Sequence, residues 1–487
     1  MNIGVQLDRE DYLYDIHSLV KSFFPDDDVS IYTEDDADRC KAARDFLLCV
    51  HIPEEGDRKT VKDSLKKEIY GLLSDYTGKS LPWGTLSGIR PTKIPMKMLE
   101  EGLGDLEIKE RMQEAYLISD EKAELAIRVA KKERELLSGV SLGPETFSLY
   151  LHVPFCPSIC LYCTFSASCA SQWEGRMDEY LDAVEYELSC GRPMGRLDAE
   201  KEGRPHSGQM SDVPDTGRKP VTFYVGGGTP TSLSARQLDR LLDMAEEYYD
   251  FSACIERTVE AGRPDSVTRK KLEILKKHHV TRISINPQTM NQRTLDLIGR
   301  GHTAEDTQRA FYMAREAGFD NINMDIILGL PGEEPEDVAR TLDLIEKMSP
   351  DSLTVHSLAV KRASRLTRKL REEFEAGRIG DYSRYEGLAF VNSEAIIGMA
   401  YESAARMGMN PYYLYRQKNM KGGLENTGFA RPGKECLYNI LIMEEMQGIK
   451  AFGAGASTKM VYPDGRIERI INPKDVRTYL ERVESAK

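Results

Sequence analysis

Long apolar runs and an excess of positive charge are both missing from this sequence of 487 residues. Without a stretch of about 20 apolar residues, the chain predicts no membrane-spanning helix. The net charge of −13 argues against nucleic acid or an anionic membrane surface as the main partner. The N-terminal run MNIGVQLDREDYLYD is acidic and lacks the basic-then-apolar pattern of a signal peptide. We therefore expect a cytoplasmic protein, long enough for two or three domains.

The nine cysteines lack the paired C-x2-C knuckles of a common structural zinc site. Their odd number, without a secretion signal, indicates reduced thiols and a metal site rather than a disulfide framework. Three of them, Cys156, Cys160 and Cys163, stand in the run FCPSICLYC after an apolar, strand-like segment. Each iron of a [4Fe–4S] cluster takes one thiolate, so three thiolates hold three irons and leave the fourth iron open. We therefore interpret these three cysteines as cluster ligands.

Two other interpretations of this cysteine run remain open. A zinc ion needs a fourth ligand, and the only histidine nearby, His152, lies on the preceding strand. Plain buried thiols need no ligand at all. Cys169 comes six residues after Cys163 and is a poor candidate for the same loop. An open iron accepts a small molecule that chelates through nitrogen and oxygen, and the run resembles the cluster motif of radical S-adenosylmethionine (SAM) enzymes.

Strand-like and helix-like segments alternate from about residue 147. This alternation predicts parallel strands joined by right-handed crossovers. Six such units are fewer than the eight of a closed TIM barrel. We expect an α/β fold with a partial, open (β/α)6 barrel, as the radical SAM resemblance also implies. The expected strands are 147–155, 221–228, 256–262, 281–288, 321–330 and 351–360.

Three domains are expected along the chain. Residues 1–140 predict an α+β N-terminal domain, in which apolar spacing over 61–78 indicates a helix that ends at a glycine. Residues 145–370 correspond to the barrel, and 371–487 are expected to form a mostly helical C-terminal domain that covers the substrate. The polar stretch 191–219 is rich in Gly and Pro, which predicts a mobile surface insertion or a substrate lid.

Glycines and polar residues at the expected strand ends are candidate ligand contacts. Ligands of parallel α/β folds bind at the carboxyl ends of strands. The second strand ends in Gly226, Gly227, Gly228, Thr229 and Pro230, where glycine lets the backbone approach a ligand closely. A tight strand-to-helix turn is the alternative explanation. Further polar candidates at or beyond later strand ends are Glu260, Gln288, Arg300 and Asp325, and together they predict one binding crevice.

Several motifs occur in the order seen in oxygen-independent coproporphyrinogen III oxidases, and the resemblance covers about residues 145–465. The motifs are YLHVPFCPSICLYC, YVGGGTPTSL, INPQTMNQRTLDLIGRGHT, NMDIILGLPG, ARPGKECLYN and FGAGAS. The run WGTLSGIRPTKI (83–94) resembles the longer branch of that family, which is found in anaerobic and facultative bacteria. Relatives of these oxidases include haem chaperones and anaerobic haem-degrading methyltransferases.

The resemblance implies a role for each candidate position. Tyr150 matches a tyrosine that contacts SAM, and Tyr162 matches an aromatic residue that packs on the adenine. Gly227 and Gly228 match glycines that meet the methionyl group, with Thr229 next in the chain. Residues matching the polar SAM contacts are Glu260, Gln288, Arg300 and Asp325.

The implied reaction is oxidative decarboxylation of two propionates of coproporphyrinogen III to vinyl groups, giving protoporphyrinogen IX for haem biosynthesis. Its implied cofactors are a [4Fe–4S] cluster and SAM, and its electrons come from a small donor such as flavodoxin or ferredoxin. Two positions depart from the family pattern. Phe165 stands where the oxidases carry a further cysteine, and Tyr438 stands where the chaperone branch has a histidine proposed to bind haem.

The implied substrate is a porphyrinogen with four propionates, so cationic side chains should line its site. A porphyrinogen oxidase, another tetrapyrrole-acting radical SAM enzyme and a non-catalytic haem chaperone are the alternatives. Each cationic candidate taken alone is more often a solvated surface charge. The candidates are Arg263, Lys361, Arg362, Arg365 and Arg416.

Overall fold

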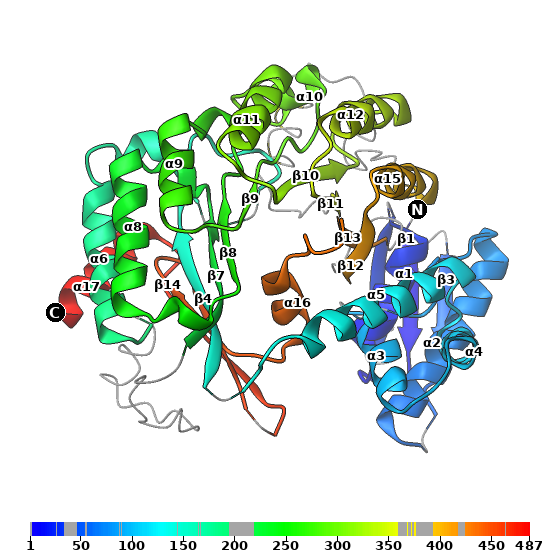
Figure 1. Cartoon of the computed structure of the whole chain (residues 1–487). Helices are drawn as coiled ribbons and strands as arrows, with labels where there is room; N and C mark the ends of the chain where they lie inside the picture. Colours follow the sequence, from blue (N-terminus) through cyan, green and yellow to red (C-terminus); the bar gives the residue numbers. More distant parts are fainter. Residues whose placement is uncertain are drawn as a thin grey trace.

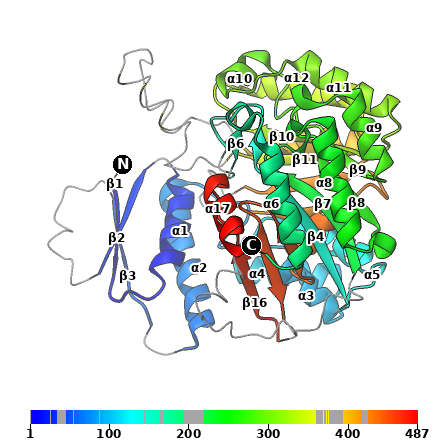
Figure 2. The same cartoon turned by 90° about the vertical axis from the view of Figure 1, so that its left-hand side faces the viewer.

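The fold is described from a computed structural model of the whole chain (Figures 1 and 2). It describes residues 2–33, 46–193, 219–358, 393–416 and 424–487, apart from a few single positions within these ranges. Most of the stretch 191–219, and the candidates Lys361, Arg362 and Arg365, lie outside the described residues.

The chain begins with a small parallel sheet of its own. Strands β1 (Asn2–Leu7), β2 (Asp28–Thr33) and β3 (Phe46–Val50) pair in the order β2-β1-β3. Alternate residues of β1 are fully buried under helices α1 (Leu13–Phe23) and α2 (Arg58–Thr77), which lie against the same side of the sheet (Figure 2).

Helix α2 confirms the expected helix over 61–78. The side chain of Asp57 caps its first turn by accepting hydrogen bonds from the N–H groups of Lys59 and Thr60. Gly78 then ends the helix with φ of 66°, a left-handed conformation that glycine adopts without steric cost.

Three further helices precede the barrel. They are α3 (Lys93–Glu100), α4 (Asp105–Tyr116) and α5 (Asp120–Ser138). Their apolar faces meet around Trp83, Ile108 and Met112, which are almost fully buried. Helix α5 also packs against strand β12 (Asn410–Tyr415) of the C-terminal region, so this helical group is joined to the barrel rather than set apart from it (Figure 1).

Six parallel strands follow in simple sequential order and confirm the expected partial barrel. Side chains alternate along each strand, so Leu149, Phe223 and Val225 face the outer helices while Tyr150 and Tyr224 face the concave side, here called the lumen. The strands are β4 (Thr146–Val153), β7 (Lys219–Gly227), β8 (Glu256–Glu260), β9 (Arg282–Ser284), β10 (Ile322–Leu328) and β11 (Ser352–Ser357).

The outer side of these strands is covered by helices that belong to the same core (Figure 1). Helix α8 shows why one such helix starts where it does, because Ser234 and Gln237 form a reciprocal capping box at its first turn. The covering helices are α6 (Met177–Cys190), α8 (Ala235–Tyr248), α9 (Arg269–Lys277), α11 (Ala304–Glu316), α12 (Pro335–Met348), α15 (Glu394–Arg406) and α17 (Val476–Ala486), with the short α10 (Gln292–Leu297) between β9 and α11.

Strands from the last part of the chain extend the barrel sheet at both edges. Strand β13 (Asn426–Ala430) pairs antiparallel with β11, and β14 (Ile449–Phe452) pairs parallel with β4. Helix α16 (Leu437–Glu444) contacts β7 and the outermost strand β12 (Asn410–Tyr415), and Glu256 at the start of β8 anchors it, so it crosses the lumen near the amino ends of the strands. Strands β15 (Ser457–Val461) and β16 (Ile467–Ile471) complete the sheet.

The described C-terminal region therefore differs in one respect from the mostly helical domain that the sequence predicts. It contributes five strands to the large sheet beside three helices. Short, irregular strands such as Asn410–Tyr415 owe their conformation to pairing with a distant strand, which local sequence does not reveal. The division into residues 1–140, 145–370 and 371–487 stays a prediction.

Among the helices that the structure describes, none combines the length and the apolar character needed to cross a bilayer.

Candidate active site at the carboxyl end of the barrel

The three predicted cluster cysteines lie in one loop directly after the first barrel strand. Cys156 ends the short strand β5 (Phe155–Cys156), Cys160 is buried, and the N–H of Cys163 donates to the carbonyl of Cys160 at 3.1 Å. Burial raises the pKa of the Cys156 thiol to about 11 and also raises the pKa of Cys163. The loop therefore places three thiols at the end of the barrel where ligands of this fold class bind.

Cys169 lies closer to this loop than its sequence distance suggests. Strand β6 (Ser168–Cys169) runs parallel to β5, and Cys169 is the register partner of Cys156. The Cys169 thiol contacts the carbonyl oxygen of Pro157 at 3.4 Å and Oγ of Ser171 at 3.3 Å. Cys169 therefore lies beside the loop, where its side chain is held by its own partners, and its weak candidacy as a cluster ligand stays a prediction.

The glycine run fits tightly against the strand that leads into the cysteine loop. The N–H of Gly228 donates to the carbonyl of Val153 at 2.8 Å, and the N–H of Thr229 donates to the carbonyl of Phe155 at 2.7 Å. A Cβ atom on Gly228 would lie 2.6 Å from the Phe155 oxygen, which leaves room for glycine alone. Thr229 also donates from Oγ1 to Sγ of Cys156 at 3.5 Å. The run therefore fixes the position of the first cluster cysteine.

Gly227 meets a different neighbour. Its φ is 109°, and an added Cβ would lie 2.7 Å from the imidazole ring of His152. The Nδ1 atom of that ring lies 3.2 Å from the hydroxyl of Tyr150, the residue predicted to contact SAM. His152 thus belongs to the lumen beside Tyr150 and does not supply a fourth ligand in the cysteine loop.

The second half of the cysteine loop rests on the segment before Arg300. The N–H of Leu161 donates to the carbonyl of Ile298 at 2.9 Å, and Ser158 donates to the carbonyl of Gly299 at 3.0 Å. The ring of Tyr162 packs against the apolar cluster of Ile298, Ile327 and Leu330. Such an apolar wall suits the face of an adenine ring, which is the role that the sequence predicts for Tyr162.

Two carboxylates share the lumen: Glu260 ends β8 and Asp325 lies in the middle of β10, with β9 between the two strands. Glu260 accepts a hydrogen bond from the hydroxyl of Tyr224 at 2.5 Å. Burial raises the pKa of Glu260 to about 7; the Tyr224 bond opposes this rise, whereas the nearby charge of Asp325 adds to it. Burial acts in the same direction on Asp325, but hydrogen bonds from His356, Asn323 and Thr354 outweigh it and hold the pKa of Asp325 below its usual value. Paired acids of this kind suit a cationic ligand.

Gln288 joins this group through its backbone. Its N–H donates to the carbonyl of Asp325 at 3.0 Å, and its carbonyl accepts from the N–H of Ile327 at 2.9 Å. With φ of 67° it adopts a left-handed conformation, and its buried Oε1 has no hydrogen-bond partner among the described residues. A buried amide oxygen in this state offers an acceptor to a ligand hydroxyl.

Three tyrosine rings are stacked in the lumen. The ring of Tyr438 on α16 lies 4.4 Å from that of Tyr224 and 6.2 Å from that of Tyr150, measured between centroids. Its helix is anchored by Glu256, whose carboxylate accepts the N–H groups of Leu437 and Tyr438 at 2.6 and 3.1 Å. Tyr438 thus occupies the lumen beside the predicted SAM contacts.

The residues at this end of the barrel fit a [4Fe–4S] cluster with SAM. Among the described residues, one set of three or more His, Cys, Asp or Glu ligand atoms lies within 4.8 Å of one another, and the three cysteines are not in it. The three cysteine sulfurs are therefore too far apart to bind one shared metal ion. This wider spacing is what a multi-iron cluster requires, because each thiolate binds its own iron. The acids Glu260 and Asp325, with the free amide oxygen of Gln288, complement a ligand that carries an ammonium, a sulfonium and ribose hydroxyls.

Two of the predicted propionate partners have other roles. Arg263 is buried and binds Ser158 and Asp265, so it supports the cysteine loop. Arg416 is bonded to the carbonyl of Leu86 and lies over the ring of Trp83, in the N-terminal helical group. Phe165, which replaces the further cysteine of the oxidases, is strongly exposed beside the loop.

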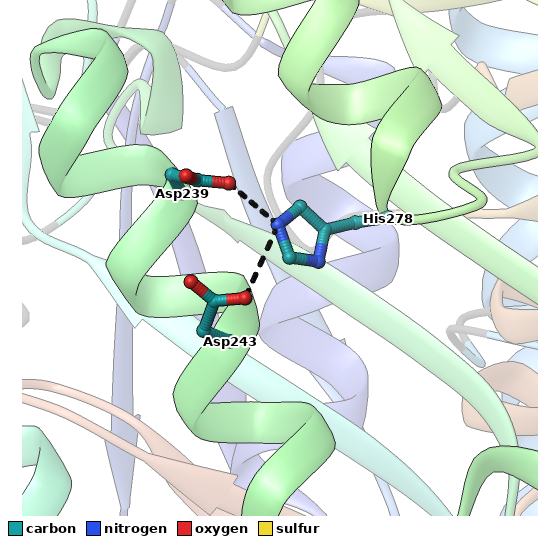
Figure 3. Close-up of side chains that lie close together, drawn as sticks. All are labelled: Asp239, Asp243 and His278. Atoms are coloured by element: carbon teal, nitrogen blue, oxygen red, sulfur yellow. Dashed lines mark hydrogen bonds and ion pairs between the residues drawn. The ribbon is translucent and has the colours of Figure 1, made fainter.

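A separate group of possible ligand atoms lies on the outer helices (Figure 3). Nε2 of His278 is 2.8 Å from Asp239 and 3.7 Å from Asp243, and its Nδ1 is 3.0 Å from Glu246. Lys277 already lies 2.7 Å from the same Asp239 oxygen. This network of ion pairs joins α8 to the end of α9 without needing a metal ion.

Comparison with known proteins agrees with this geometry. A family model for the radical SAM superfamily matches residues 210–345. The oxygen-independent coproporphyrinogen-III oxidase-like protein HemZ of Bacillus subtilis (strain 168) is 39% identical over 428 residues, which cover 88% of this chain and 79% of that protein. The Heme chaperone HemW of Lactococcus lactis subsp. lactis (strain IL1403) is 31% identical over 316 residues, covering 64% and 69% of the two chains.

The oxidases themselves are also matched. The oxygen-independent coproporphyrinogen III oxidase of Escherichia coli (strain K12) is 31% identical over 228 residues, 47% of this chain and 45% of that enzyme. The solved structure of coproporphyrinogen III oxidase (HemN) from Escherichia coli superposes with a TM-score of 0.51 and 24% identity, covering 72% of each chain. That likeness establishes the fold.

Proposed function

Because this chain belongs to the radical SAM family of oxygen-independent coproporphyrinogen III oxidase-like proteins, we propose that it is an enzyme that decarboxylates propionate side chains of coproporphyrinogen III. Its cofactors are a [4Fe–4S] cluster and SAM. When bound and reduced by one electron, they supply a 5′-deoxyadenosyl radical that removes a hydrogen atom from the substrate. The proposed electron source is a small donor protein such as flavodoxin or ferredoxin.

One observation carries this proposal: the residues expected to bind SAM surround a single lumen beside the cysteine loop. Arg300 contacts Tyr162 and Cys160, Asp325 contacts Gln288, and the charge of Asp325 acts on Glu260. This arrangement supports the binding of SAM beside the cluster. We favour turnover, and an anaerobic assay tests it against haem delivery.

Each group has a proposed task at a stated atom. The Glu260 carboxylate accepts the ammonium of SAM, Oε1 of Gln288 accepts a ribose hydroxyl, and the apolar wall beside Tyr162 receives the adenine. Residues 371–487 would cover the barrel opening, since α16 already crosses the amino end of the lumen and presents Tyr438 to it. Covering the opening excludes water and oxygen from the radical.

Tyr438 is the observation that weighs against the haem chaperone. Its ring is stacked on the rings of Tyr150 and Tyr224. The position of the proposed haem-binding histidine therefore holds a phenol that packs on two other phenols. A haem ligand at this place would have to leave the stack.

An anaerobic assay tests the proposal. The reconstituted protein is incubated with SAM, dithionite and coproporphyrinogen III, and the products are followed by mass spectrometry. Loss of two carboxyl groups together with 5′-deoxyadenosine formation is expected, and the Cys160→Ala variant should give neither. SAM cleavage with an unchanged porphyrinogen would reject this substrate. Haem would then be supplied, since a methylated or opened haem would indicate the methyltransferase alternative.

A further inference from the structure

Two buried arginines hold the cysteine loop, but only one of them has an acidic partner. Arg263 and Arg300 are 3% and 5% exposed. Arg263 contacts Asp265 through Nε and Nη2 at 3.1 and 3.0 Å, and its Nη1 donates to the carbonyl and hydroxyl of Ser158 at 3.1 and 3.0 Å. Its charge is therefore balanced by a bidentate carboxylate.

Among the described residues, Arg300 has no carboxylate in contact, and the charge of Asp265 reaches it only from a longer distance. Its Nη2 donates to the carbonyls of Gly262 and Asn286 at 3.0 and 2.6 Å, and its Nη1 donates to the hydroxyl of Tyr162 at 3.1 Å. In the part of the chain that the structure describes, no carboxylate lies within 4.0 Å of this guanidinium, and its buried Nε has no hydrogen-bond partner. The backbone carbonyls and the phenol that it contacts are neutral.

The remaining neighbour of Arg300 is a cluster ligand. Nη1 lies 3.8 Å from Sγ of Cys160, within the range of an N–H···S hydrogen bond. A buried charge that lacks a partner is costly, whereas a thiolate beside it offsets that cost. Cys160 becomes such a thiolate when it binds iron. The guanidinium is thus placed to pair with the cluster through this sulfur.

A cation at this position has a definite effect on electron transfer. A [4Fe–4S] cluster becomes more negative by one charge when it accepts an electron, so a nearby positive charge favours the reduced state. Hydrogen bonds to cysteine sulfurs act in the same direction and are among the known determinants of cluster potential. We propose that Arg300, through its N–H···S contact with Cys160, raises the reduction potential of the cluster independently of any contact with SAM.

Arg263 offers the matched comparison. It is equally buried and touches the same loop, but Asp265 contacts it directly, it binds Ser158 rather than a cysteine, and its charge reaches Cys156 only from a longer distance. Its removal should loosen the loop without the same change in potential. The two arginines therefore separate the electrostatic effect from simple mechanical support. The inference rests on the cluster alone and not on the identity of the tetrapyrrole.

The test is an anaerobic redox titration without SAM or substrate. Wild type, Arg300→Gln, Arg300→Lys and Arg263→Gln are reconstituted, and the reduced cluster is followed by electron paramagnetic resonance as the potential is lowered. The midpoint of Arg300→Gln should move to a more negative potential, and the midpoints of Arg300→Lys and Arg263→Gln should move clearly less, because neither variant removes both a charge and an N–H···S contact.

Equal midpoints for wild type and Arg300→Gln would overturn the inference, whatever happens to SAM binding. An equal shift in Arg263→Gln would also overturn it, because loop support would then explain both. If Arg300→Gln does not retain a cluster, Arg300→Lys decides the matter. Its lysine keeps the charge but lacks the fork that reaches two carbonyls and the sulfur together. An unchanged midpoint in that variant, with weakened SAM binding, would contradict the proposal.

Discussion

The hydroxyl of Tyr224 donates a 2.5 Å hydrogen bond to Oε1 of Glu260. This bond joins the stack of lumen tyrosines to the carboxylate that is expected to receive the cationic end of SAM. Because burial raises the pKa of Glu260 to about 7, the group changes charge near neutral pH. Its protonation therefore affects both folding and ligand binding.

Glu260→Gln should change how stability depends on pH. A carboxyl whose pKa is raised in the folded state favours folding while it is protonated, and this contribution is lost as pH rises from about 4.5 to about 7. We expect Glu260→Gln to match wild type at pH 5 and to exceed it by about 1–2 kcal/mol at pH 8, a value reduced for the partial exposure of the side chain.

Chemical denaturation of the protein without cofactors measures this difference at the two pH values. Glu110→Gln on the exposed side of α4 serves as the control and should show no such dependence. A constant difference between Glu260→Gln and wild type across this range would contradict the assigned pKa. SAM binding by Glu260→Gln should be weaker than wild type at pH 8, where the ammonium loses its anionic acceptor, and close to wild type at pH 5, where the wild-type carboxyl is protonated.

Cys160→Ala should abolish cluster assembly. Each iron needs its thiolate, and a loop with two thiolates holds too few irons. Iron and sulfide content, with the visible absorbance of the reconstituted protein, gives the measurement. Cys190→Ser at the end of α6 is the matched control and should load normally. Retention of the cluster and of SAM cleavage by Cys160→Ala would refute the ligand assignment.

Gly228→Ala should also disturb cluster binding, because it displaces the strand that leads to Cys156. The added methyl group would lie 2.6 Å from the carbonyl oxygen of Phe155 and 2.9 Å from that of Val153, so the strand before Cys156 must move. We expect reduced iron loading and weaker SAM binding, both measured after reconstitution. Gly398→Ala, where no atom lies within 4 Å of the new methyl group, should load normally.

A buried ion pair joins the N-terminal helices to the C-terminal region. Nζ of Lys122 lies 2.5 Å from Glu425, which also accepts from Trp83 and Tyr401 at 2.8 Å. Lys122→Met should destabilise the protein by about 3–5 kcal/mol, because it leaves a buried carboxylate without its cation. Lys131→Met, which breaks the exposed pair with Asp105, should cost under about 1 kcal/mol in the same denaturation measurement.

Tyr438→Ala should cost about 3–5 kcal/mol of stability, since it removes a large buried ring from the stack. Tyr438→Phe keeps the ring, and its stability should remain close to that of wild type.

Neither wild type nor Tyr438→Phe should bind haem tightly, which absorbance titration with haem would show. Tight haem binding by wild type that is lost in Tyr438→Phe would instead favour the chaperone and a phenolate ligand.

The strand–helix alternation and the cysteine spacing were sufficient to predict the fold, because both depend on local pattern, whereas the site residues stay a prediction. Roles that depend on distant partners were not visible. Arg263 and Arg416 have the right charge for a propionate, but Asp265 and Leu86 engage them. Nothing in the neighbouring sequence shows that these partners are close in space.

Two residues of the candidate site in the lumen were not predicted from the sequence. Tyr224 and His356 were not among the candidates, although both lie on predicted strands. The two-residue period of a strand places Tyr224 on the same face as Gly226, and this signal would have identified it. Tyr438 was noted as a departure, but its position in the stack follows from α16 crossing the lumen.

The two edge strands of the barrel, β4 and β11, pair with strands β14 and β13, which are synthesised later. Ser148 in the first strand pairs with Ile449, and Val355 in the sixth pairs with Thr427. While residues 426–452 are still missing from a nascent chain, both edges expose unpaired backbone groups, which favour intermolecular strand pairing. At about 5–20 residues per second, the sixth strand waits several seconds for its partner and the first strand waits tens of seconds. Productive biogenesis should therefore depend on chaperones that shield a growing barrel.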